Sequence, residues 1–168
     1  MTYGPGYGST TAFLTLFLTI EAIAIGFAIL VGIVYYVLDG FAFMKLFRKV
    51  GVEPWAAWVP IFNFWRLLEL GGQPGWLSLL SLVSPASIVA AVFECIAAYR
   101  VGLAFRRDGG WVVLFIFFPF AWAWSMAADD LAYEPTLYAQ HGYGPPLVGY
   151  GSPRGPYVPP TYPAPPPA

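Results

Sequence analysis

Residues 54–76, PWAAWVPIFNFWRLLELGGQPGW, decide the fold, because long apolar runs precede and follow them. The segment is rich in tryptophan, and a proline-containing turn signal closes it at each end. Its apolar body, residues 52–70, is close to the shortest length that crosses a bilayer as a helix. We interpret it as a short membrane-embedded hairpin element. Whether it crosses fully or is re-entrant sets the topology of the whole chain.

The composition predicts an integral membrane protein. Of the 168 residues, 58% are hydrophobic and 10% are charged, whereas about a quarter of the residues of a water-soluble domain are charged. The mean hydropathy is +0.64. Aromatic residues make up 19% of the chain, and tryptophan and tyrosine collect at membrane interfaces. The net charge of −1 offers no basic face to nucleic acid, so we expect membrane lipids as partners and no nucleic acid.

Four apolar segments are expected to cross the membrane, at about residues 12–38, 53–70, 76–98 and 111–127. A helix needs about 20 apolar residues to cross a hydrocarbon core about 30 Å thick. Pro60, Pro85 and Pro119 lie inside the last three segments, so we expect kinked helices there. The predicted fold class is therefore all-α, a small bundle of about four transmembrane helices within a polytopic membrane domain at 12–130.

The first apolar run follows a short polar N-terminal tail, residues 1–11, that contains no Lys or Arg. A signal peptide has a basic n-region and a shorter apolar core, so we expect residues 12–38 to be a retained span. Within it Ala24, Ala28 and Gly32 recur every four residues. Such a ridge of small side chains lets another helix approach closely and predicts helix packing.

Three polar residues inside the expected spans form a candidate intramembrane polar site. Glu21 lies in the first span, Asn63 in the second and Glu94 in the third. An ionisable or amide group at membrane depth marks a functional site or needs a partner inside the protein. The functional interpretation is a proton or ion site. The alternative is a side chain that only hydrogen-bonds a neighbouring helix.

Two basic clusters predict the topology. Lys45, Arg48 and Lys49 follow the first span, and Arg106 and Arg107 precede the last. The other helical face of the first cluster carries Phe43, Met44, Phe47 and Val50, which predicts an interfacial amphipathic segment or a plain topology anchor. If all four segments cross, both clusters lie inside, as the positive-inside rule requires, and both termini lie outside.

The C-terminal residues have a different composition. Residues 131–168 are rich in Pro, Gly and Tyr and have few aliphatic side chains to bury. We therefore expect a disordered tail with local polyproline II character. Residues 156–159 match a PxxP pattern, but such a match is expected by chance in so proline-rich a sequence. A solvated tail is the simpler interpretation.

Residues 43–130 resemble an uncharacterised family of small bacterial integral membrane proteins. The resemblance rests on KLFRKVGVEPWAAW, VPIFNFWRLLEL, the GQPGW turn, YRVGLAFRRDGG, FIFFPFAW and the acidic ADD that follows. It implies a polytopic α-helical membrane domain and brings no activity, cofactor or catalytic residue. Some relatives carry signal peptidase I labels or neighbours. That chemistry needs a lysine base on the outer face, whereas Lys45 and Lys49 are predicted inside.

No constellation of residues predicts catalysis, a cofactor or a metal site. The only histidine, His141, falls in the expected tail, and the only cysteine, Cys95, lies in an apolar run. Asp129 and Asp130 are adjacent acids just past a helix, which are usually solvated.

The leading functional hypothesis is a non-enzymatic, multi-pass protein of the bacterial plasma membrane, acting in membrane assembly, as a scaffold or in envelope interactions. A homo-oligomer or a membrane protein partner would cover its helix faces. The alternative is a small transporter or pore that uses Glu21 and Glu94 as intramembrane polar sites. The ligand, partner and oligomeric state do not follow from the sequence.

Overall fold

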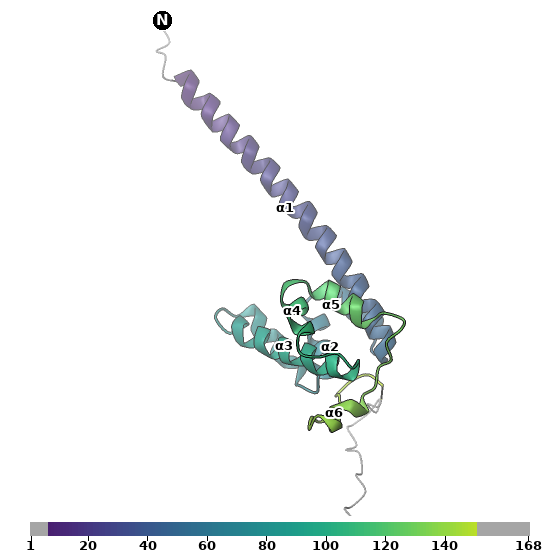
Figure 1. The fold of residues 1–168 in the computed structure, drawn as a ribbon. Helices are drawn as coiled ribbons and strands as arrows, with labels where there is room; N and C mark the ends of the chain where they lie inside the picture. Colours follow the sequence, from purple (N-terminus) through teal and green to yellow (C-terminus); the bar gives the residue numbers. More distant parts are fainter. Residues whose placement is uncertain (1–6, 151–168) are drawn as a thin grey trace, which may run out of the picture. The chain divides into compact units, whose positions relative to one another are not determined.

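The structure, a computed structural model, describes residues 7–150, and every regular element in that range is a helix (Figure 1). The expected all-α class is therefore confirmed. The elements in chain order are α1 (Tyr7–Val50), the 3₁₀ helix η1 (Pro54–Trp58), α2 (Phe62–Leu70), the 3₁₀ helix η2 (Gly75–Leu82), α3 (Ser87–Ala104), α4 (Trp111–Phe117), α5 (Pro119–Met126) and α6 (Thr136–Gln140).

The chain divides into two units, Met1–Leu38 and Asp39–Ala168, here called unit 1 and unit 2. In unit 1 the described part is helical, and every side chain from residue 10 to residue 38 is exposed. No proline interrupts residues 7–50, so α1 runs unbroken until Gly51, whose φ of 78° ends it in the left-handed region.

Two helices of the described chain are long and apolar enough to cross a membrane. They are Thr10–Val50, which belongs to α1, and Ser87–Ala104, which is α3. The three expected spans at 53–70, 76–98 and 111–127 are each divided into two helices: η1 and α2, η2 and α3, and α4 and α5. The nine residues of α2 rise only about 14 Å, less than half of a hydrocarbon core.

A proline lies at each of the three divisions. Pro85 stands between η2, which ends at Leu82, and α3, which begins at Ser87. Pro119 has no N–H to donate and favours the first turn of a helix, so α4 ends at Phe117 and α5 begins at Pro119. Pro60 precedes Ile61, which has a φ of 69°, and α2 begins only after it. The expected kinks are therefore breaks between two separate helices.

The last three turns of α1 form the centre of unit 2. Phe43, Leu46, Phe47 and Val50 are fully buried there. The interfacial segment expected at the first basic cluster is thus corrected: its apolar face packs against protein. Burial of a large apolar side chain contributes roughly 1.5–3 kcal/mol, so residues 43–50 stabilise unit 2 directly.

An aromatic cluster forms part of this core. Trp122 of α5 is fully buried. Its ring lies edge-on to Phe115 with centroids 5.2 Å apart, and it lies 6.5 Å from the ring of Phe43. The cluster therefore ties α4 and α5 to the end of α1.

The turn at residues 71–75 allows α2 and α3 to approach closely. A Cβ atom added at Gly71 would lie 2.7 Å from the Cα atom of Ala97, and one added at Gly75 would overlap the Trp65 ring. Gly72 adopts a φ of 73°, a conformation that glycine takes readily. The GGQPG sequence is thus required both by the turn and by helix contact.

The tail predicted from residue 131 contains ordered structure. Residues 136–150, here called the strap, include α6 and the fully buried Tyr138. The strap donates three hydrogen bonds to carbonyls at helix ends: Tyr138 Oη to Leu70 (3.1 Å), Leu147 N to Glu69 (2.7 Å) and Tyr150 N to Val50 (2.8 Å). Carbonyl groups in the last turn of a helix lack intrahelical donors. The strap supplies O–H and N–H donors to these carbonyl groups. Residues 151–168 of the expected tail lie outside the described residues.

Candidate functional site

Among the three residues of the expected polar site, the structure gives Asn63 a specific partner. Asn63 is 4% exposed, and its Nδ2 donates to Oδ2 of Asp39 at 3.1 Å. Glu94 is half-buried on α3, and Glu21 is exposed in unit 1. Sequence reasoning missed Asp39, although it is the polar residue that ends the first apolar run and a buried asparagine needs such a partner.

The Asp39–Asn63 pair has unused hydrogen-bonding capacity. Oδ1 of Asp39 and Oδ1 of Asn63 are both buried without a donor. A proton on the carboxyl group would turn one of these acceptors into a donor. Next to the pair, the Trp58 ring packs over Gly40, where an added Cβ would lie 2.8 Å from it. The Asp39–Asn63 pair is therefore a largely buried polar contact that borders the apolar core.

The first basic cluster lies beside an acidic helix end. Lys45 Nζ is 3.6 Å from Oδ1 of Asp129, and Lys49 donates to the carbonyl oxygen of Ala128. The ammonium group of Lys49 also lies 5.5 Å from the centroid of the Phe105 ring. Lys49 therefore joins the end of α1 to the chain just after α3 and just after α5.

The second basic cluster is largely neutralised within the chain. Arg106 donates from Nε and Nη2 to the two carboxylate oxygens of Glu134, at 3.1 and 2.9 Å, and this contact raises the pKa of Arg106. The guanidinium of Arg107 lies over the Trp111 ring at 4.3 Å. The two arginines serve as fixed structural cations more than as a free basic patch.

A surface pocket of about 280 Å³ lies next to this cluster, lined by Phe105, Arg106, Arg107, Asp130, Leu131, Ala132 and Glu134. Its charges are of both signs, and Arg106 and Glu134 already bind each other. No group of three His, Cys, Asp or Glu side chains that could hold a metal ion occurs among the residues that the structure describes. The pocket therefore offers no arrangement that favours one ligand.

Alkali is expected to destabilise unit 2 through two tyrosines near the strap. The hydroxyl oxygen of Tyr133 is buried and makes no hydrogen bond of normal geometry, although it interacts electrostatically with Tyr138. Burial raises the pKa of Tyr133 from 10.0 to about 12, and raises that of Tyr138 well above 10.0. A raised folded-state pKa gives stability that is complete below pH 10 and is lost as the pH rises toward 12. For Tyr133 alone the loss is about 2–3 kcal/mol.

Urea unfolding of unit 2 at several pH values, followed by far-ultraviolet circular dichroism in a mild detergent, measures this loss. Tyr133→Phe should flatten the decline between pH 10 and pH 12. An unchanged slope in that variant would show that Tyr133 does not cause the pH dependence.

Comparison with known proteins identifies one family that matches part of the chain. Residues 55–135 match a family described as Family of unknown function (DUF5684). No curated protein and no solved structure gives a significant match to the chain. The family match confirms the resemblance to an uncharacterised family that the motifs of residues 43–130 predict, and it extends from η1 to the residues that follow α5.

Proposed function

We propose that this protein is a non-enzymatic component of a membrane assembly. Residues 12–38 cross the bilayer and pack against a helix of another chain, and unit 2 is held at the membrane by that crossing. The proposed location is a bacterial plasma membrane. The observation that carries the proposal is the fully exposed apolar surface of α1 between residues 10 and 38.

The apolar surface of α1 at residues 10–38 is unfavourable in water and favours contact with lipid or with another apolar surface. Each large apolar side chain left in water forfeits roughly 1.5–3 kcal/mol, and unit 1 exposes such side chains throughout, for example Phe13, Ile23 and Phe27, which are each about two-thirds exposed. The 27 residues from 12 to 38 rise about 40 Å as a helix, enough to cross a hydrocarbon core about 30 Å thick with some tilt.

The small-residue ridge is the part of this surface suited to protein rather than lipid. A Cβ atom added at Gly32 would meet nothing within 4 Å. The ridge of Ala24, Ala28 and Gly32 is therefore open to a helix from another chain, either a second copy or a different membrane protein. Close backbone approach at small residues is a common mode of helix association in membranes.

Filling this ridge is expected to disrupt the assembly. The triple change of Ala24, Ala28 and Gly32 to Leu keeps the helix apolar but prevents close approach. Native gels and chemical crosslinking in a mild detergent should show loss of the larger species. Gly26→Leu is the matched control, because Gly26 lies on the opposite face of α1 and also has open space around it. Equal assembly of the triple variant and the unmodified protein would contradict the proposal.

Four crossings with both termini outside stay a prediction from the sequence, and the assembly proposal does not depend on them. It needs only the crossing by residues 12–38. The polar residues Glu21, Asn63 and Glu94 likewise have no part in the ridge, so their substitution should leave the assembly unchanged.

A further inference from the structure

We infer that unit 2 inserts three apolar loops into one leaflet of the bilayer from a single side, so that residues 12–38 make the only complete crossing within residues 7–150. The three loops are residues 50–70, 71–100 and 105–128. The inference rests on the crossing in the proposed function but not on the helix packing. Three sets of contacts within unit 2 carry it.

The first loop begins and ends at the strap. The carbonyl oxygen of Val50 accepts a hydrogen bond from the backbone N–H of Tyr150 at 2.8 Å. At the other end of the loop, the carbonyl oxygen of Leu70 accepts one from the hydroxyl of Tyr138 at 3.1 Å. Both ends are therefore held by the same short segment, and residues 50–70 return to the side from which they leave.

The second loop also closes on itself. Arg100 Nη1 donates to the carbonyl oxygen of Gly71 at 3.1 Å, so the start and the end of residues 71–100 are adjacent. The whole of α3, Ser87–Ala104, rises about 27 Å and is long enough to cross a membrane by itself. Because Arg100 is held at Gly71, where the loop begins, only the part from Ile88 to Arg100, about 18 Å, extends away from this closure. We therefore assign α3 as one arm of a hairpin rather than a crossing.

The third loop returns to Lys49. The ammonium group of Lys49 lies 5.5 Å from the Phe105 ring centroid and donates to the carbonyl oxygen of Ala128. The ion pair of Arg106 with Glu134, at 2.9 Å, joins the same two stretches of chain. Residues 105–128 thus leave and return on the side of the basic clusters, with the break at Pro119 between the two arms.

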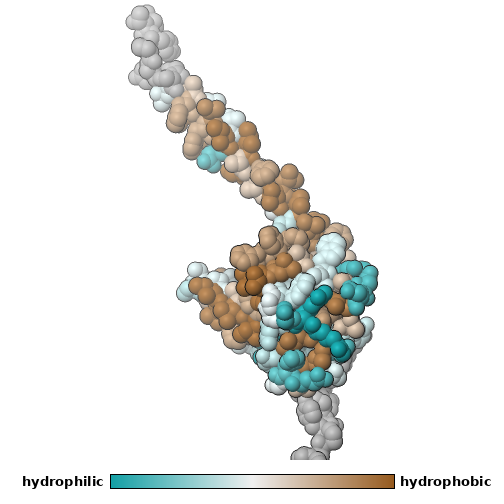
Figure 2. Space-filling view, viewed as in Figure 1, coloured by the Kyte–Doolittle hydropathy of each residue, from teal (hydrophilic) through white to brown (hydrophobic). Residues whose placement is uncertain are grey.

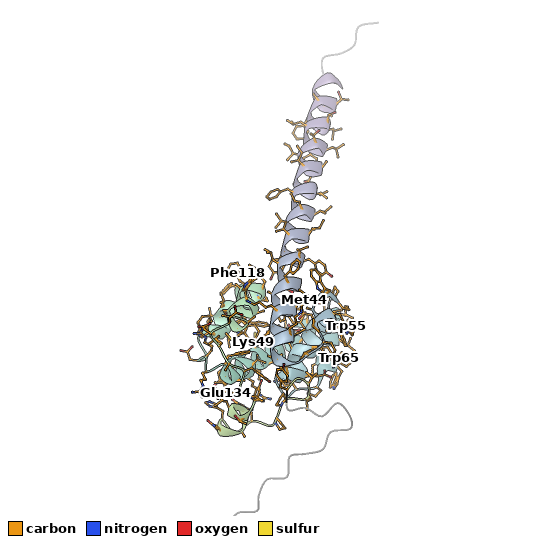
Figure 3. The ribbon with its side chains drawn as sticks, turned by 90° about the vertical axis from the view of Figure 1, so that its right-hand side faces the viewer. Met44, Lys49, Trp55, Trp65, Phe118 and Glu134 are labelled. Atoms are coloured by element: carbon orange, nitrogen blue, oxygen red, sulfur yellow. The ribbon has the colours of Figure 1, made fainter. Side chains whose placement is uncertain are left out.

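The far ends of the second and third loops are apolar and exposed. Leu82 and Ile88 are 67% and 69% exposed, and Phe117 is 69% exposed. Hydrophobic surface gathers over α4 and along the arm formed by η2 and α3, whereas the most hydrophilic surface of unit 2 gathers on a separate part of this face (Figure 2). Within unit 2, Phe118 and Glu134 lie at opposite ends, with Met44 and Lys49 of α1 between them (Figure 3).

We assign the acyl chains of lipid as the medium that surrounds the exposed apolar ends of the loops. Unit 2 begins at Asp39, directly after the apolar run that ends at Leu38, so no linker separates it from the bilayer. Trp55 and Trp76 are each more than half exposed, and tryptophan is favoured at the membrane interface. Glu134, which pairs with Arg106, lies at the end of unit 2 opposite Phe118 (Figure 3). The carboxylate of Asp129, which pairs with Lys45, is 95% exposed, so these charged groups can remain in water.

Single cysteines test this arrangement in the full-length protein reconstituted in vesicles. Cys95 is the only cysteine, so Cys95→Ser gives a background without thiols. Leu82→Cys and Phe117→Cys report on the loop ends, Asp129→Cys on the charged side and Thr10→Cys on the N-terminal end of the crossing. The readouts are labelling by a membrane-impermeant maleimide from each side, and quenching of an attached fluorophore by lipids brominated on their acyl chains.

The inference predicts that the loop-end fluorophores are quenched by brominated lipid and that their thiols escape the impermeant reagent from both sides. Asp129→Cys should be labelled from one side only, and Thr10→Cys from the other side. Labelling of Leu82→Cys or Phe117→Cys by the reagent, or shielding without quenching, would overturn insertion into lipid. Labelling of Asp129→Cys and Thr10→Cys from the same side would overturn the single crossing. None of these results depends on the native-gel test of the helix ridge.

Discussion

Trp122→Ala is expected to lower the free energy of unfolding of unit 2 by about 3–5 kcal/mol, the usual cost of truncating a buried tryptophan. The side chain is fully buried, and it contacts Phe115 of α4 and Phe43 of α1. Its removal leaves a cavity between α4 and the end of α1. Urea unfolding in a mild detergent, followed by circular dichroism, measures the change.

Trp124→Ala is the matched control for this prediction. Trp124 lies two residues further along α5 and is 47% exposed, so its truncation leaves no comparable cavity. We expect a change close to the range of about ±0.5 kcal/mol that is usual for surface positions. Equal losses in the two variants would mean that Trp122 does not occupy the core described here.

Tyr138→Ala is expected to lower the free energy of unfolding of unit 2 by a similar amount, about 3–5 kcal/mol by analogy with other large aromatic residues. The ring is 1% exposed, and the hydroxyl donates to the carbonyl oxygen of Leu70. Its loss would remove the anchor that holds the strap to the end of α2. A tail without structure predicts the opposite result, because truncating a solvated side chain costs almost nothing.

Tyr138→Phe separates the ring from the hydrogen bond. The phenylalanine keeps the buried ring but leaves the Leu70 carbonyl without its donor, which should cost about 1–3 kcal/mol. The expected order of stability is unmodified protein, then the phenylalanine variant, then the alanine variant, in the same urea measurement. Full stability in the alanine variant would rule out the strap as part of the folded unit.

The family match and the folded unit do not coincide. The match covers residues 55–135, but the core that these residues surround is filled from outside it. Phe43 and Phe47 enter this core from α1 before the match. Tyr138, which is buried against the end of α2, comes from the strap after it. A fragment limited to the matched residues would lack both, so the whole of unit 2 is the appropriate unit for experiments on this family segment.

Several features followed from the sequence because they depend on local pattern or on composition. The low charge and high apolar content indicated a membrane solvent, and apolar residues without strand alternation indicated helices. The resemblance to an uncharacterised family was also recognised from its motifs. The small ridge at Ala24, Ala28 and Gly32 needs only helical periodicity. Of these, the all-helical class and the family resemblance are confirmed, and all of them depend on residues that are neighbours in the chain or on one helix.

Tertiary structure alone decided how the segments are joined. Pro119 was expected to kink one helix, but whether a proline bends a helix or ends it depends on what its free carbonyls can bind. The strap was missed because few of its side chains are aliphatic, and it is held by one tyrosine and by hydrogen bonds to carbonyls of distant helix ends. Those carbonyls become available only when α1 and α2 end side by side, and no pattern within either segment shows that they do.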